Sequence, residues 1–153
     1  MKVTAFNDLA RDRAVAVLLG CCTAAQWAER VADARPFGSI AQLLAVADAA
    51  LTPADLDAAL AGHPRIGDRS ASVRSAAEQR GVGDDVVAAF AVANAAYEEQ
   101  FGRVYLVCAS GRSGTELLAD LHSRLANDPD TERRTALREL AAINRLRLAA
   151  VFA

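Results

Sequence analysis

The feature that most constrains the fold of this chain is its abundance of alanine, with few β-branched residues and with glycine and proline only at intervals. Alanine has the highest helix propensity, whereas glycine and proline interrupt or end helices. The pattern predicts an all-α protein, a single compact domain over residues 1–153 with about eight helices. Of the 153 residues, 53% are apolar and 24% are charged, which is typical of a folded globular chain.

Capping residues and chain breaks indicate where these helices lie. Ser39 suits an N-cap, Ser113 and Glu116 have capping-box spacing, and Asp128 precedes a proline that opens the last helix. Gly62 suits a left-handed C-terminal cap. The predicted helices are 8–19, 23–34, 40–50, 52–61, 72–80, 85–100, 115–126 and 129–151. The apolar run 104–109 fits a strand or a buried helix equally well, because periodicity does not separate the two.

Charge and cysteine usage exclude several classes of protein. The net charge of −2, from 17 basic and 19 acidic residues, argues against a nucleic-acid-binding domain. No apolar run reaches the roughly 18 residues of a membrane span, and the first residues do not resemble a signal peptide. The three cysteines, Cys21, Cys22 and Cys108, predict reduced, buried thiols and a cytoplasmic protein.

One of the two histidines lies on a rigid turn. Pro64 disfavours the helical region for His63, and Gly62 and Gly67 flank the corner. The position fits a histidine that packs or lies at the surface, and it also fits a proton-transfer group. His122 lies within a predicted helix and is expected on its surface.

Two helices carry polar groups that could bind a ligand. Ser75, Glu78 and Gln79 are spaced to share one helical face, which is either a solvated face or a site for a polar ligand. In the last helix, Arg147 falls within the apolar stripe, whereas Arg145 falls on the solvent face. An inward arginine fits an internal ion pair, a side chain that reaches out to solvent, or a clamp for an anion.

Together these segments resemble the OHCU decarboxylase family, which acts on 2-oxo-4-hydroxy-4-carboxy-5-ureidoimidazoline (OHCU). The resemblance covers nearly the whole chain, since FN, the region of Trp27 and RPF match in order before the later motifs. Those motifs are HPRIG (63–67), SxxEQ (75–79), NxxYxxxFG (94–102), YLVCASGR (105–112) and IxxLRL (143–148).

The resemblance implies an all-helical fold, a homodimer, no metal or organic cofactor, and formation of (S)-allantoin in the last step of urate breakdown. It implies three catalytic residues, with His63 as the acid/base, Glu78 as its carboxylate companion and Arg147 as a late active-site arginine. The implied substrate-binding residues are Pro64, Ser75, Gln79, Tyr105, Leu106, Val107, Cys108 and Ala109, the last five largely through their backbone. Tyr105 replaces an expected phenylalanine, so its hydroxyl could change the polarity of the pocket.

Two other interpretations stay open at this point. The chain could be a helical interaction module without catalysis, in which His63, Glu78 and Arg147 lie far apart. It could also be a family member that binds a related ureide without converting it. A metal site is not expected, because the histidines and cysteines lack ligand spacing. The segment GVGDD (81–85) lacks the preceding strand and third glycine of a dinucleotide-binding loop.

Overall fold

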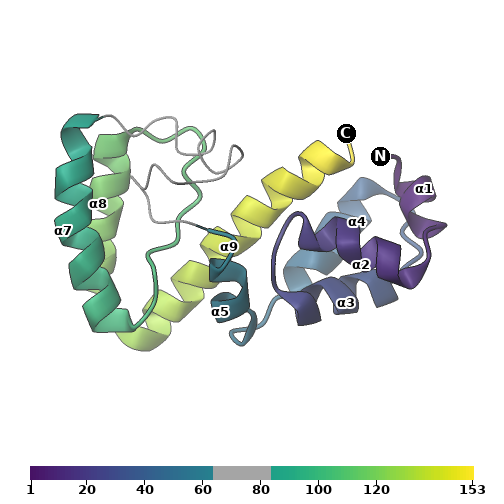
Figure 1. Cartoon of the computed structure of the whole chain (residues 1–153), viewed down its shortest axis with the longest axis horizontal. Helices are drawn as coiled ribbons and strands as arrows, with labels where there is room; N and C mark the ends of the chain where they lie inside the picture. The colour runs from purple at the N-terminus through teal and green to yellow at the C-terminus, as the bar shows by residue number, and fades with distance from the viewer. Residues whose placement is uncertain (64–83) are drawn as a thin grey trace. The chain divides into compact units, whose positions relative to one another are not determined.

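The computed structural model describes residues 1–63 and 84–153, and every regular element within these ranges is an α-helix (Figure 1). The all-α prediction is therefore confirmed. The helices are α1 (Val3–Asn7), α2 (Arg11–Leu19), α3 (Ala25–Asp33), α4 (Ile40–Ala49), α5 (Asp55–Leu60), α7 (Asp84–Phe101), α8 (Gly114–Arg124) and α9 (Pro129–Val151). The predicted helix 72–80 lies outside the described residues.

Three predicted N-caps are present. The Ser39 hydroxyl accepts a hydrogen bond from the backbone N–H of Gln42 at the start of α4. At the start of α8, Ser113 and Glu116 form a capping box, in which each side chain accepts from the other residue's N–H. The Asp128 carboxylate accepts from the N–H of Thr131 at 2.9 Å and so caps the start of α9.

Three of the predicted helices begin later than expected, and local bonds explain why. The N–H of Asp8 bonds to Thr4 O, so residue 8 closes the short helix α1 and does not open α2. The Thr23 hydroxyl donates to Ala58 O at 2.6 Å and does not cap α3. The Asp55 carboxylate accepts from the N–H of Thr52 at 2.8 Å, which makes residues 52–54 a turn that leads into α5.

Two further expectations are corrected. Gly62 is not in the left-handed conformation, which among the described glycines only Gly102 and Gly111 adopt. A Cβ at Gly62 would lie 3.0 Å from Thr23 Cγ2, so the close approach of Thr23 accounts for the glycine. Residues 104–109 form neither a strand nor a helix, and they cross from α7 to α8 as irregular chain.

The chain divides into two compact units, and the first comprises Met1–Gly62 and Leu140–Ala153. Helix α3 packs against α2, α4 and α5, and the Trp27 indole N–H donates to Ala47 O at 2.8 Å. The Phe6 ring meets the Phe152 ring edge-on at 5.1 Å between centroids, which brings the last residues into the core formed by the first.

The second unit is the continuous segment His63–Glu139. Helices α7 and α8 pack side by side within it (Figure 1). Its core combines Phe90 and Tyr97 of α7 with Leu117 and Leu121 of α8 and with the buried ring of Tyr105. The expectation of one domain over residues 1–153 stays a prediction.

Candidate functional site

His63 is the first residue of the second unit and directly follows the corner at the end of α5. It is 9% exposed and lies in irregular chain. The residue before it is constrained in two ways, because Gly62 N–H donates to Ala59 O at 3.1 Å and a Cβ at Gly62 would lie only 3.0 Å from Thr23 Cγ2. His63 is thus a buried residue that follows a constrained corner of the chain, and its role as the acid/base stays a prediction.

Several predicted site residues cannot be placed against His63. Pro64, Ser75, Glu78 and Gln79 lie outside the described residues. The proximity of Glu78 to His63 therefore stays a prediction that rests on the family resemblance.

Arg147 and Arg145 differ as the helical pattern predicts. Arg147 is 7% exposed, and its Nη1 donates to Cys21 O at 3.1 Å within the first unit. Arg145 is exposed and forms a surface ion pair with Asp48 of α4. Arg147 is thus an internal residue with a carbonyl partner, and its guanidinium is oriented by the chain between α2 and α3.

Two buried polar side chains lie in this part of the first unit. Cys22 and Asn144 are each 1% exposed, and both the Asn144 side chain and the charge of Arg147 act on the Cys22 thiol. Burial raises the pKa of the Cys22 thiol, although a hydrogen bond from Asn144 and the charge of Arg147 act in the opposite direction. Cys21 and Cys22 are buried, as predicted, whereas Cys108 is partly exposed, so the prediction of a buried thiol is wrong there.

The segment 105–109 is mostly buried, and two of its backbone groups bond to side chains. Leu106 O accepts from Arg124 Nη1 at 2.6 Å. The N–H of Cys108 donates to Glu139 Oε2 at 3.1 Å. Val107 is 5% exposed and Ala109 is 8% exposed, which leaves Cys108 as the more accessible position of the segment.

The Tyr105 hydroxyl is engaged inside the second unit. It donates to the Asp120 carboxylate of α8, and the ring is 2% exposed. Burial first, and then the bond to Asp120, raise the pKa of Tyr105. Because this hydroxyl is held by α8, the structure gives no support to the expectation that it changes the polarity of a pocket.

A buried ionic network in the second unit was not anticipated from the sequence. Glu132 is 0% exposed, and it accepts from Arg124 Nε at 2.7 Å and from the Tyr97 hydroxyl at 2.7 Å. Glu132, Ala136 and Leu140 follow one another at four-residue spacing on α9. Glu132 therefore shares the apolar stripe of the last helix, and the helical periodicity that singled out Arg147 could have found it as well.

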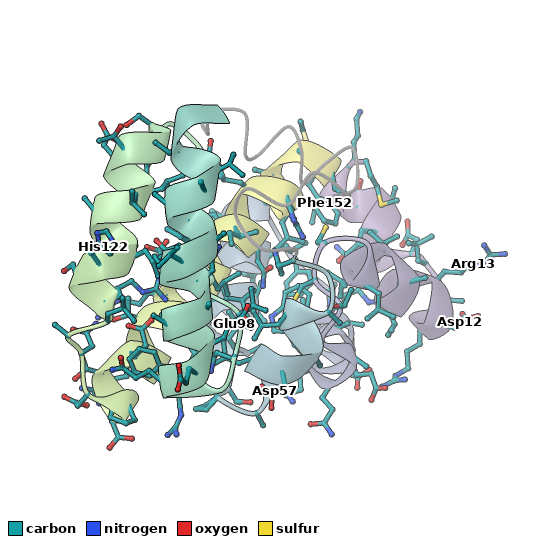
Figure 2. The ribbon with its side chains drawn as sticks, turned by 60° about the vertical axis from the view of Figure 1, so that its left-hand side comes forward. Asp12, Arg13, Asp57, Glu98, His122 and Phe152 are labelled. Atoms are coloured by element: carbon teal, nitrogen blue, oxygen red, sulfur yellow. The ribbon has the colours of Figure 1, made fainter. Side chains whose placement is uncertain are left out.

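The other histidine is on the surface. His122 projects outward from α8 (Figure 2) and is exposed, as predicted. Within residues 1–63 and 84–153, no group of three or more His, Cys, Asp or Glu side chains is placed to hold a metal ion. None of the helices in the described part of the chain is both long enough and apolar enough to span a membrane.

Comparison with known proteins identifies the family. The sequence profile described as OHCU decarboxylase matches residues 7–149. The chain belongs to the OHCU decarboxylase family. A 2-oxo-4-hydroxy-4-carboxy-5-ureidoimidazoline decarboxylase from Haloferax volcanii is 29% identical over 134 residues, which are 82% of this chain and 80% of that protein.

Other members of the family agree in sequence and in fold. A uric acid degradation bifunctional protein TTL from Arabidopsis thaliana is 29% identical over 147 residues; the match takes in 86% of this chain but only 45% of that protein. The crystal structure of an OHCU decarboxylase in the presence of (S)-allantoin superimposes with a TM-score of 0.77 at 25% identity, over 88% of this chain and 95% of that chain.

Proposed function

We propose that the protein decarboxylates OHCU to (S)-allantoin and CO2, the last step of urate degradation. The observation that carries this proposal is the match of the OHCU decarboxylase profile over residues 7–149. The histidine and late arginine that the family resemblance marks are present as His63 and Arg147.

The proposed reaction needs no electron-accepting cofactor. The substrate carries its carboxylate on a ring carbon that also bears a hydroxyl and lies next to a C=N bond. When the C–CO2 bond breaks, the electron pair that it leaves can pass into this C=N bond. A proton then returns to carbon to give allantoin, and delivery to a single face gives one enantiomer.

The proposed roles divide into proton transfer and charge binding. His63 exchanges a proton with the substrate hydroxyl and later delivers one to a single face of the ring, and Glu78 orients it or raises its basicity. Arg147, Gln79 and Ser75 supply donors to the anionic and polar groups of the substrate. A histidine on a stiff corner suits stereospecific delivery, because a loosely held imidazole would lose both rate and selectivity.

The remaining proposed contacts shape the pocket. Pro64 lines it beside His63, and residues 105–109 meet the ring through their backbone. The C–CO2 bond must be held perpendicular to the ring so that the electron pair overlaps with the C=N system, which is a matter of positioning.

The test is circular dichroism of urate converted in situ by urate oxidase and hydroxyisourate hydrolase, with and without this protein. Spontaneous decay gives racemic allantoin slowly, whereas we expect fast decay to the (S) enantiomer. No increase over the spontaneous rate would reject the proposal and would favour a non-catalytic binding module.

Matched variants assign the roles. His63→Gln is expected to abolish the rate enhancement, while the same change at the exposed His122 leaves it intact. Arg147→Gln is expected to weaken substrate binding strongly, and Arg145→Gln serves as its surface control. Wild-type turnover by His63→Gln would show that the assignment of the acid/base is wrong.

We also propose that the chain forms a homodimer and works in the cytoplasm. The family resemblance supports the dimer, and the buried cysteines Cys21 and Cys22 suit a reducing compartment. Light scattering at several protein concentrations tests the assembly, and a monomer mass at all of them would reject the dimer.

A further inference from the structure

The segment 104–109 is held in place by side chains from two helices. It belongs to no helix or strand, although Leu106 is 3% exposed and Val107 is 5% exposed. Buried backbone groups outside regular structure need other hydrogen-bond partners. Arg124 of α8 donates to Leu106 O at 2.6 Å, and Glu139 of α9 accepts from the N–H of Cys108 at 3.1 Å.

These two bonds lie on either side of Val107 in the chain. A donor on α8 binds the carbonyl of the residue before Val107, and an acceptor on α9 binds the N–H of the residue after it. A chain held on both sides of one residue has little freedom to rotate about its axis. The side chains of Arg124 and Glu139 therefore fix which backbone groups the segment presents.

The bond from Glu139 lies where the segment becomes accessible. Cys108 is partly exposed, whereas its neighbours Val107 and Ala109 are buried. A ligand that meets the backbone of this segment would do so around residue 108. The Glu139 carboxylate therefore restrains a backbone group at that position.

The Glu139 carboxylate is itself held in place. It is 16% exposed, and its Oε1 lies 3.6 Å from Arg112 Nη2. Arg112 also lies 4.0 Å from Asp120, the residue that binds the Tyr105 hydroxyl. The carboxylate is thus fixed between the N–H of Cys108 on one oxygen and a cation on the other, and hydrogen bonds to charged groups are the stronger kind.

We propose that Glu139 is a positioning residue for the reaction: by holding the N–H of Cys108, it sets the backbone of residues 105–109 against the substrate. The inference rests on the proposed function, since it takes that segment to be part of the substrate site. Glu139 does not touch the substrate in this proposal and acts through the backbone of Cys108.

The experiment compares Glu139→Ala and Glu139→Gln with Arg138→Ala, a change at the exposed neighbouring residue on α9. The first readout is hydrogen exchange of the Cys108 amide by NMR. The second is the Kd for (S)-allantoin, and the third is the KM and kcat for OHCU. Circular dichroism and urea unfolding verify that each variant is folded.

Loss of the acceptor should release the segment. In Glu139→Ala we expect Cys108 exchange to accelerate by about tenfold or more and the affinity for (S)-allantoin to fall by a similar factor, as for one lost hydrogen bond. Glu139→Gln keeps an oxygen that accepts, so it should stay within about threefold of the wild type. Arg138→Ala should change neither readout. If Glu139→Ala does not fold, Glu139→Asp takes its place. Its side chain is one methylene shorter, so we expect faster Cys108 exchange and weaker (S)-allantoin binding there too.

The outcomes separate this inference from the proposed function. Unchanged exchange in Glu139→Ala overturns the inference, and so does faster exchange with wild-type affinity and turnover, which would make the bond purely structural. Failure of the wild type to bind (S)-allantoin also overturns it. If the wild type binds (S)-allantoin but does not convert OHCU, and Glu139→Ala weakens that binding, the positioning role stands and the proposed function fails.

Discussion

Replacing Glu132 by glutamine tests how the second unit is stabilised. The carboxylate is 0% exposed and accepts from Arg124 Nε and from the Tyr97 hydroxyl, each at 2.7 Å. Asn127 Nδ2 adds a further bond at 3.0 Å. Glutamine keeps the volume but removes the charge, and it turns one of the two accepting oxygens into a donor that faces other donors.

The expected loss of stability follows from the charge left behind. Arg124 is 3% exposed, and removing one partner of a buried ion pair costs about 3–5 kcal/mol. Asp120 lies 3.7 Å from Arg124 Nη1 and compensates in part, although its own side chain is 29% exposed. We therefore expect a loss of about 3 kcal/mol in the free energy of unfolding, a large fraction of the roughly 5–15 kcal/mol of a typical domain.

The assay is urea unfolding followed by far-ultraviolet circular dichroism, with the m-value as a check on two-state behaviour. Asp130→Asn, which breaks the exposed pair with Arg133 on the same helix, should cost less than about 1 kcal/mol. Adding Arg124→Met to the glutamine variant should recover stability relative to the sum of the two single changes. A loss for Glu132→Gln no larger than that for Asp130→Asn would refute the reasoning.

Three further outcomes are expected. Burial, and then the bond to the buried Glu132 carboxylate, raise the pKa of Tyr97 to about 12. The stability that comes from the neutral hydroxyl is therefore present below about pH 10 and is lost as the pH rises through the raised pKa. Urea unfolding at stepped pH should show this loss of stability, and Tyr97→Phe should make it smaller. Ser113→Ala removes the cap of α8 and should lower the free energy of unfolding by about 1 kcal/mol, whereas Ser123→Ala, at an exposed position within α8, should change it little. A thiol reagent should react with Cys108 in the native protein and with the buried pair 21–22 only after unfolding, and a fast phase that persists in Cys108→Ser would contradict this.

Much of the fold could be predicted because its signals are local. The caps at Ser39, Ser113 and Asp128 act within one helical turn, so the residue types at fixed spacing identified those helix starts. Helix α1 was missed because it is five residues long and has no side-chain cap, which leaves nothing in the sequence to mark it. The run 104–109 was undecidable because its conformation depends on partners 18 and 31 residues away along the chain.

The candidate site divides in the same way. Arg147 was found from the sequence because its own helix reveals a charge on an apolar face, and the structure bears this out. Glu139 could not have been found, since its importance lies in a contact with the backbone of Cys108 in another segment. The roles of His63 and Glu78 come from the family resemblance, because no local pattern distinguishes a catalytic histidine from one that packs.

The division of the chain into units has a consequence for its synthesis. Domains usually fold in the order in which they leave the ribosome, but the first unit is split between Met1–Gly62 and Leu140–Ala153. Phe152 packs on Phe6, and Arg147 donates to Cys21 O, so the core of the first helices is complete only once the last residues have been synthesised. The continuous segment His63–Glu139 is synthesised in full before the last part of that core, so we expect the second unit to complete its fold before the first.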